Sequence, residues 1–527
     1  MLDLIVRHGS VIDGTGAPAF RADVGIRDGR IASLTDLSDA VAAQELDASG
    51  LLVAPGFIDI HSHSDFTLIA DPRAQSSVAQ GVTTELIGNC GHGCAPVADV
   101  DAAKGNIYGY RACPPITWHS IGEYLRVLEA ARPAVNVLTL VPNGMLCRAV
   151  LGLDDRPPTG AELRRIGRLL EAGLEEGAIG FSVGLEYPIE RSCTTDQLVE
   201  LCKIVAKHGG LFAPHLRNKD VAGLDAIEEG LQIAASSGVR LHIPHLVQRP
   251  GGPADADAQA FALIDRALES GLDVSIDMHT RLHGLTNLAA ALPSWVLEGN
   301  GARLRERLRD PSIRGRLAQY KSLITSLALG GWDRVSLLTS ARRPDLLGKS
   351  FADIARLNGT TPFDAVLDVL LDEADDPHFP LCIAESYTEE QLRRAYEHPA
   401  CMVASDATAL CIDGPLADST FHGAYTWVSW FFRRFVREER AFTREQAVRK
   451  LTAQPADRLG LSDRGVLTVG KCADVAVFDP DVFGERGTVD HPNQLAQGMV
   501  HVLVNGEVEM QDGRLTTRRG GRVLTRQ

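Results

Sequence analysis

The middle of the chain repeats a strand followed by a helix at a nearly constant spacing. Strands expected to start near Gly210, Val239 and Leu272 are separated by 29 and 33 residues, which is the length of one strand-helix unit. Segments with helical apolar periodicity lie between them, for example "LDAIEEGLQIAASSG". Such a repeat requires parallel strands with helices on the outside. We therefore predict an α/β fold, a TIM-like (β/α)8 barrel.

Eight segments are expected to form the barrel strands. In chain order they are "FIDIHSH", "VTTELIGNC", "VNVLTLVP", "AIGFSVGL", "GLFAPHL", "VRLHIPHL", "LDVSIDM" and "CMVASDA". About 110 residues separate the last two, and such a connection is too long for a bare loop. We therefore expect an inserted subdomain between strands 7 and 8, at about residues 284–360.

Both ends of the chain consist of short predicted strands joined by tight turns. Asp28-Gly29 and Asn505-Gly506 are hairpin signals between alternating segments. Chain ends commonly lie close together, so we expect one small β-sandwich built from both termini. The predicted division is residues 1–54 and 466–527 for the sandwich and 55–465 for the barrel.

Composition narrows the class of protein. The 527 residues carry a net charge of -15, so there is no basic excess to bind nucleic acid. We find no leader and no apolar run approaching 18 residues, and we expect no membrane span. The ten cysteines are scattered without a Cys-x-x-Cys pair, which indicates reduced thiols and a cytoplasmic protein. The sequence leaves open whether the protein is a homo-oligomer.

Metal-binding side chains stand at the ends of the predicted strands, where barrels of this kind form their active sites. These residues are His61, His63, Cys90, His215, His245 and Asp406. Taken singly, a strand-end His or Asp is more often a cap, and Cys90 is more often a small buried apolar residue. Taken together they supply the thiolate and imidazole ligands that Zn²⁺ prefers. His92, His242 and His279 lie nearby in sequence and are expected to have supporting or structural roles.

The first strand carries the most specific of these signals. In "FIDIHSHSDF", His61 and His63 are one residue apart after an apolar run. Side chains at positions i and i+2 of a strand point to the same face, with Cα atoms roughly 6.5 to 7 Å apart. Both imidazoles can therefore reach one metal ion.

Several motifs give the chain a resemblance that covers residues 54–480. They are "APGFIDIHSHSD", "QGVTTELIGNCG", "GFSVGLEYP", "HLRN", "SDA", "EQAVRKLTAQPADRLGL" and "GKCADVAVFDP". With them the chain resembles the amidohydrolase superfamily, and within it the N-acyl-D-amino-acid deacylase (D-aminoacylase) family. The resemblance implies a barrel with a small β-sandwich and one tightly bound zinc, held chiefly by Cys90, His215 and His245. It also implies a second, weaker metal position near His61 and His63, and Asp406 as the catalytic acid/base.

The strand-four region distinguishes this branch from its cyclic-amide relatives. Hydantoinases and dihydropyrimidinases resemble the fold but bridge two metals with a carboxylated lysine at the end of strand four. No lysine occurs between Lys104 and Lys203. We therefore predict hydrolysis of a linear, non-peptide amide: zinc lowers the pKa of a bound water to about 7, and Asp406 transfers the proton to the leaving nitrogen.

The expected partner is a small-molecule acyl amide, and departures from the family pattern bear on its charge. The family pairs the substrate α-carboxylate with a Lys two residues after the sixth-strand His and an Arg in a His-Pro-Arg run. Here these positions are Val247 and Gly423. Tyr187 matches a substrate-contact position, although it could equally be a packing aromatic. We predict a substrate without the usual free α-carboxylate.

Other activities remain open at this point. Arg281, near the end of strand seven, could bind a carboxylate from a new direction, and the protein would then be a true N-acyl-D-amino-acid deacylase. A cyclic amide, urea or ester hydrolase would use the same chemistry. A non-catalytic scaffold is the remaining alternative, but no ligand position and no eighth-strand Asp has been lost.

Overall fold

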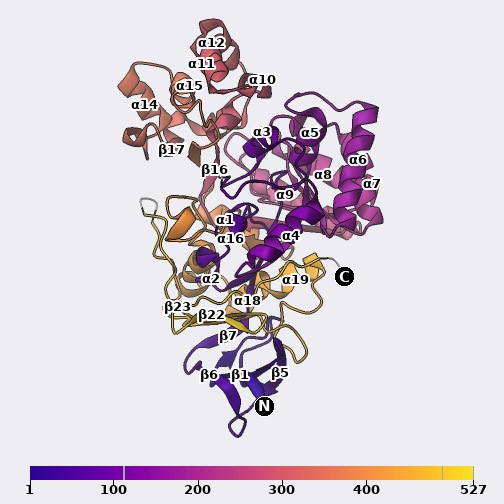
Figure 1. Ribbon diagram of the computed structural model, residues 1–527, viewed down its shortest axis with the longest axis vertical. Coiled ribbons are helices and arrows are strands. Elements are labelled where there is room, and N and C mark those ends of the chain that lie inside the picture. Colours follow the sequence, from indigo (N-terminus) through magenta and orange to yellow (C-terminus); the bar gives the residue numbers. More distant parts are fainter. Residues whose placement is uncertain (111–112, 489–490, 526–527) are drawn as a thin grey trace.

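The computed structural model describes residues 1–110, 113–488 and 491–525. The molecule is elongated, with the barrel in the middle, the inserted segment at one end of the long axis and the chain's N-terminal strands at the other (Figure 1). No helix within these ranges is long and apolar enough to cross a membrane.

Parallel strands form the central barrel, and they coincide with the eight predicted segments. They are β8 (Phe57–Asp59), β9 (Val82–Ile87), β10 (Asn136–Thr139), β12 (Gly180–Gly184), β13 (Leu211–His215), β14 (Arg240–Ile243), β15 (Val274–His279) and β19 (Cys401–Ala404). Neighbours pair in parallel register. A short strand, β11 (Val141–Pro142), follows β10 and pairs with β12, and a parallel bridge between Ser62 and Ala407 joins the first strand to the last. The barrel prediction is confirmed.

Amphipathic helices surround these strands. The main ones are α4 (Ile121–Ala131), α6 (Gly160–Glu175), α7 (Thr195–Lys207), α8 (Gly223–Ser237), α9 (Ala256–Glu269), α16 (Glu389–Glu397) and α18 (Arg444–Leu451). The start of α6 follows from its sequence, because Thr159 and Glu162 form a reciprocal capping box. Its buried residues include Ile166, Leu170 and Leu174, which lie on the apolar face expected from the helical period. The apolar face of each helix covers the barrel, and the strand ends remain available for the site.

Strands from both chain ends share one sheet. Its order is β23-β22-β21-β20-β7-β2-β3, in which β2 (Ser10–Val11), β3 (Phe20–Arg21) and β7 (Leu52–Pro55) are N-terminal. The C-terminal members are β20 (Val475–Phe478), β21 (Met499–Val504), β22 (Glu507–Gln511) and β23 (Arg514–Leu515). A second sheet contains β1 (Leu2–Arg7), β4 (Asp23–Arg27), β5 (Arg30–Thr35) and β6 (Ala42–Asp47). The predicted sandwich from both termini is therefore present.

Both predicted hairpin turns occur. Asp28 and Gly29 join β4 to β5, and Asn505 and Gly506 join β21 to β22. All four residues have positive φ, between 51° and 82°, as a type I′ hairpin turn requires. Apolar side chains from both sheets form a common core.

The segment between β15 and β19 packs as a separate unit. It contains an antiparallel sheet of β16 (His283–Asn287), β17 (Val335–Thr339) and β18 (Leu381–Glu385). Its helices include α10 (Ser294–Leu297), α11 (Gly301–Arg309), α12 (Pro311–Leu317), α13 (Leu323–Leu327), α14 (Phe351–Asn358) and α15 (Pro362–Asp372). These elements bury their own apolar core. The central strand of this sheet, β18, lies beyond residue 360. The domain boundaries stay predictions.

Candidate metal centre

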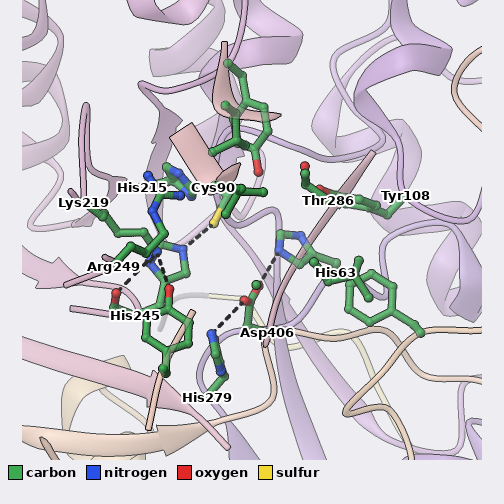
Figure 2. A pocket seen from close by; sticks show the side chains of 17 residues that line it. His63, Cys90, Tyr108, His215, Lys219, His245, Arg249, His279, Thr286 and Asp406 are labelled. Atoms are coloured by element: carbon green, nitrogen blue, oxygen red, sulfur yellow. Dashed lines mark hydrogen bonds and ion pairs between the residues drawn. The ribbon is translucent and has the colours of Figure 1, made fainter. Parts of the chain in front are cut away.

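The six predicted donors converge at the C-terminal mouth of the barrel. Their ligand atoms form two groups, and within each group all of these atoms lie within 4.8 Å of one another. We call Cys90, His215 and His245 the thiolate cluster. We call His61, His63 and Asp406, together with the shared Cys90, the aspartate cluster. Donors from distant parts of the chain thus meet at one point (Figure 2).

Three of the donors stand on left-handed backbone. The φ angles are 54° at Cys90, 37° at His245 and 43° at Asp406. Residues with side chains rarely adopt this conformation, and it is concentrated at functional sites. Each of the three lies two or three residues past the end of its strand, in the turn that changes the direction of the chain. Local strain at three strand ends therefore accompanies the convergence of the donors.

The thiolate cluster has the geometry of a ligand set. Cys90 Sγ lies 3.4 Å from His245 Nε2. His215 Nε2 lies 2.8 Å from Glu186 Oε2, and its other nitrogen, Nδ1, is buried without a hydrogen-bond partner among the described residues. One thiol and two imidazoles are preferred zinc ligands, and a carboxylate behind a ligand histidine fixes its orientation. The residues present therefore fit a zinc ion.

The aspartate cluster is held by a different set of partners. His61 Nε2 lies 3.3 Å from Cys90 Sγ, and its Nδ1 lies 3.2 Å from Asp277 Oδ2. His63 Nε2 lies 3.2 Å from Asp406 Oδ1. His61 Nε2 also lies 3.5 Å from Asp406 Oδ1, so both histidines of the first strand reach the same carboxylate, as their one-residue spacing predicted.

Electrostatic environment separates the two clusters. Burial opposes ionisation of Cys90, but the nearby His61 and His245 outweigh it and hold the thiol pKa well below its usual value. Burial, aided by the positive charge of Lys219, lowers the pKa of His245 to about 4. In the aspartate cluster burial lowers the pKa of both histidines, but anionic neighbours outweigh it. Contacts with Asp406 and Cys90 raise the pKa of His63 to about 9, and Cys90 and Asp277 raise that of His61 well above its ordinary value.

Asp277, on β15, is a buried site residue that the sequence analysis did not identify. Its Oδ1 accepts a hydrogen bond from the backbone nitrogen of His245 at 2.8 Å. Its Oδ2 lies 3.2 Å from His61 Nδ1 and 2.9 Å from His242 Nε2. Asp277 thus contacts both clusters, and His242 has the supporting place expected of it. A carboxylate within the apolar strand "LDVSIDM" was the available signal.

The two predicted substrate residues occupy different environments. Tyr187 lines the cavity, with its ring centroid 5.1 Å from that of His215 and 4.5 Å from that of His92. Arg281 instead contacts the aspartate cluster, because its Nη2 donates to Asp406 Oδ2 at 2.7 Å. Its Nη1 lies within 3.0 Å of three backbone carbonyls.

Gly423 makes room for this arrangement. A Cβ atom at Gly423 would lie 2.9 Å from Nη1 of Arg281, and the glycine has a φ of 97°. A side chain at position 423 would therefore displace the guanidinium. Val247, the other position that departs from the family pattern, is buried in the apolar core.

The cavity beside the donors is small. Its volume is about 40 Å³, enough for only a few water molecules. Leu323 and Leu327 of α13 and residues 284–286 of β16 line it from the inserted segment, while Tyr108, Tyr387 and Phe421 add aromatic surface. Side chains of the inserted segment therefore form part of the cavity wall.

Comparisons with known proteins show which family the chain resembles. The sequence matches the Amidohydrolase family over residues 44–275 and 348–509. It is 34% identical to N-acyl-D-glutamate deacylase of Alcaligenes xylosoxydans xylosoxydans, over 96% of this chain and 93% of that protein. The crystal structure of N-acyl-D-glutamate deacylase from Bordetella bronchiseptica, complexed with zinc and a phosphonate inhibitor, is similar over 100% of both chains, with a TM-score of 0.82 and 32% identity.

A structure of D-aminoacylase, described as having a binuclear metal center with one-metal activation and second-metal attenuation, is similar over 100% of both chains. Its TM-score is 0.82 and its identity 29%. The barrel, the donor clusters and these matches define the class of protein as a hydrolase. The chain belongs to the amidohydrolase family, and its resemblance to the D-aminoacylase branch is confirmed.

Proposed function

We propose that the protein hydrolyses the amide bond of a small N-acyl compound with a zinc ion held by Cys90, His215 and His245. The thiolate cluster is the observation that carries this proposal, because the Cys90 thiol, whose pKa is lowered, lies beside two histidines. The buried Nδ1 atom of His215 has no hydrogen-bond partner among the described residues. The zinc and inhibitor bound by the Bordetella relative support it.

Zinc in such a site supplies a nucleophilic water near neutral pH and polarises the substrate carbonyl. Asp406 is the proposed acid/base: it takes the proton of the attacking water and delivers it to the leaving nitrogen. His63 on Oδ1 and Arg281 on Oδ2 orient this carboxylate. Burial opposes its ionisation, but Arg281 and His63 hold its pKa well below the usual value. The carboxylate therefore starts the reaction unprotonated.

We further propose that the aspartate cluster is the weaker of two metal positions. A metal ion there must displace protons from His61 and His63, whose pKa values are raised. Metal binding requires both imidazoles to lose a proton, so occupancy of this position is expected to rise with pH. The second-metal attenuation described for D-aminoacylase supports this assignment.

The charge of the substrate has two readings. Val247 and Gly423, in place of the family's lysine and arginine, support an acyl amide without a free α-carboxylate. Arg281 donates a hydrogen bond to Asp406 in this structure. To bind a substrate carboxylate as well, it would have to reach the substrate while keeping that hydrogen bond. The second reading, a true N-acyl-D-amino-acid deacylase, is favoured by Lys219, which lines the cavity and which the sequence analysis did not consider.

The test of the proposed function combines metal content with a substrate panel. Purified protein is expected to contain about one tightly held zinc per chain and to lose activity when a chelator removes it. The panel contains N-acyl-D-amino acids, N-acyl amines, anilides, a hydantoin and simple esters. Zinc-dependent turnover of a linear amide supports the proposal, whereas turnover confined to the hydantoin or the esters contradicts it.

We also propose a cellular compartment for the protein. All ten cysteines are free thiols, which supports a reducing compartment such as the cytoplasm. The oligomeric state stays open.

A further inference from the structure

A second, larger cavity lies between the barrel and the inserted segment. Its volume is about 900 Å³, within the range of small-molecule sites. One wall is formed by α3 (Val100–Ala103), the short helix η1 (Lys104–Asn106) and α5 (Asn143–Leu151), and the other by η3 (Leu288–Ala291), α10 and α11. In Figure 1, α3 and α5 lie on the side of the barrel that is turned toward α10. We call this cavity the outer cleft.

The outer cleft begins where the cavity beside the donors ends. Tyr187 lines both cavities. His92 also lines the outer cleft, and its ring centroid lies 4.5 Å from that of Tyr187 and 4.8 Å from that of Tyr108. Along β16, Thr286 lines the cavity beside the donors and the next residue, Asn287, lines the outer cleft. A substituent too long for the first cavity therefore has the outer cleft as its neighbouring space.

The proposed mechanism indicates which part of a substrate faces this side. Asp406 delivers a proton to the leaving nitrogen, so the amine part lies on the side of Asp406. Tyr187 instead contacts His215 of the thiolate cluster, with ring centroids 5.1 Å apart. His215 and Asp406 lie apart, with Cys90 between them (Figure 2). The acyl part, on the other side of the scissile bond, therefore points toward Tyr187 and the outer cleft.

Apolar side chains line both walls of the outer cleft. They are Ala149 and Leu153 on the barrel side and Ala289, Ala290, Leu297 and Leu304 on the inserted segment. Transfer of a hydrocarbon chain from water to such surroundings is favourable. The walls therefore suit an acyl chain longer than acetyl.

One cation in the outer cleft has no counter-charge. Arg148, on α5, is half-buried, and its Nη1 donates a hydrogen bond to the carbonyl of Ala102 at 2.6 Å. Arg148 forms no ion pair within the part of the chain that the structure describes. Burial lowers the pKa of the guanidinium to about 10, and the nearby Glu190 and Cys147 offset only part of this effect. A desolvated charge is costly without a partner, so this guanidinium favours an anionic ligand.

The other charged side chains of the outer cleft already have partners. Lys104 forms an ion pair with Asp101 at 3.0 Å. Asp375 pairs with an arginine of α11, and Asp99 caps α3 by accepting a hydrogen bond from a backbone nitrogen. Among the charged side chains described as lining the cleft, Arg148 is therefore the cation left for a bound molecule.

We propose that the outer cleft binds the acyl part of the substrate, a chain of several carbons whose far end carries a carboxylate paired with Arg148. An arginine matches a carboxylate with two parallel hydrogen bonds. The reaction is the hydrolysis proposed above: water adds to the acyl carbon, the C–N bond breaks, the nitrogen takes a proton, and a dicarboxylic acid and an amine are released. The inference rests on the proposed function and deepens it by assigning the acyl part of the substrate.

The test varies the acyl part and keeps the amine part constant, as the one that the substrate panel shows to be accepted. The acyl groups are acetyl, succinyl, adipoyl and suberoyl, the last three each with a free far carboxylate and with a far carboxamide. The wild-type protein is expected to prefer a long acid over both its carboxamide and the acetyl compound. In Arg148→Met the ratio of kcat/KM for acid over carboxamide should fall about 10- to 100-fold, since the charged partner is lost. Arg148→Gln is a second neutral variant if the methionine does not fold.

A matched control and a binding measurement separate this role from others. Arg168→Met removes an exposed arginine of α6 and is expected to leave the ratio unchanged. Calorimetry of zinc-loaded protein with suberate and with its half-amide measures binding without turnover. Arg148→Met is expected to weaken binding of suberate far more than binding of the half-amide, with zinc per chain unchanged.

A wider side chain in the cleft tests the path of the acyl chain. Ala290→Trp places an indole on the wall formed by the inserted segment. We expect kcat/KM to fall more for the suberoyl compound than for the acetyl compound. An equal fall for both would show that the acyl chain does not pass through the outer cleft.

Other outcomes also overturn the inference. A wild-type preference for acetyl over every longer acyl group would refute it, and so would an equal loss for acid and carboxamide in Arg148→Met. Both results leave the proposed hydrolysis intact. If no amide is hydrolysed, the proposed function fails, and equal suberate affinity in the wild-type protein and Arg148→Met would then reject the outer cleft separately.

Discussion

The two donor clusters share the thiolate of Cys90 but differ in what surrounds their remaining ligands. In the thiolate cluster His245 lies beside Lys219 and His215 contacts Glu186. In the aspartate cluster the histidines contact carboxylates, Asp277 and Asp406, which favour their protonated forms. We therefore expect metal affinity to depend on the neighbours of the ligands as well as on the ligands themselves. Three experiments can break or sharpen this comparison, and a fourth tests a buried carboxyl group away from both clusters.

Cys90→Ala should have the largest effect, because it removes the ligand that both clusters share. We expect bound zinc to fall to about a tenth or less of the wild-type content and activity to fall roughly 1000-fold or more, as loss of one of three strong ligands weakens the chelate. Zinc is measured per folded chain by atomic absorption. Cys94→Ala is the control, since Cys94 is equally buried but belongs to neither cluster. Full zinc occupancy in Cys90→Ala would contradict the assignment.

Asp406→Asn should affect the aspartate cluster alone. The amide cannot carry a proton between water and the leaving nitrogen, so we expect kcat to fall about 10²- to 10⁴-fold with the tightly bound zinc retained. Asp413→Asn, an exposed carboxylate that pairs with Arg73, serves as the control. Near-normal turnover of Asp406→Asn would show that another group is the base.

Asp277→Asn should weaken both clusters together. An asparagine cannot accept all three of the hydrogen bonds that the carboxylate shares with His61, His242 and the backbone of His245. Loss of such a supporting carboxylate typically lowers metal affinity 10- to 100-fold. Competition with a chromogenic chelator measures that affinity. Asp273→Asn, just before the other end of β15, is the control; equal affinities for the two variants would mean that Asp277 does not orient the ligands.

Glu509→Gln tests pH dependence away from both clusters and should have the smallest effect. Glu509, on β22, is 3% exposed, and burial raises its pKa to about 8. The folded protein therefore holds this proton more firmly than the unfolded chain does, and the stabilisation is complete below about pH 4.3. It is lost as the pH rises toward 8, by at most a few kcal/mol.

The glutamine variant lacks this titration. Its melting temperature should therefore fall less than that of the wild-type protein between pH 5 and pH 8, measured by calorimetry on zinc-loaded protein. Parallel curves for the two proteins would show that Glu509 does not titrate in this range.

Much of the architecture could be predicted from the sequence. All eight barrel strands, the capping box at Thr159 and both hairpin turns lie where the patterns place them. These features depend on local preferences: apolar periodicity, a cap three residues before its partner, and residues that tolerate positive φ. The donors could be predicted as well, because the fold places strand ends at the site. Their catalytic roles and the domain boundaries stay predictions.

What the sequence by itself determined is therefore the strand order and the identity of the donor side chains. Only the tertiary structure decided the partners of those side chains: Asp406 with His63, 343 residues apart, Arg281 against Asp406, and Lys219 beside His245. The physical reason is that such contacts follow no local period. They arise when loops from different strands close over one cavity, and a buried charge then takes whatever partner the packed chain brings within reach.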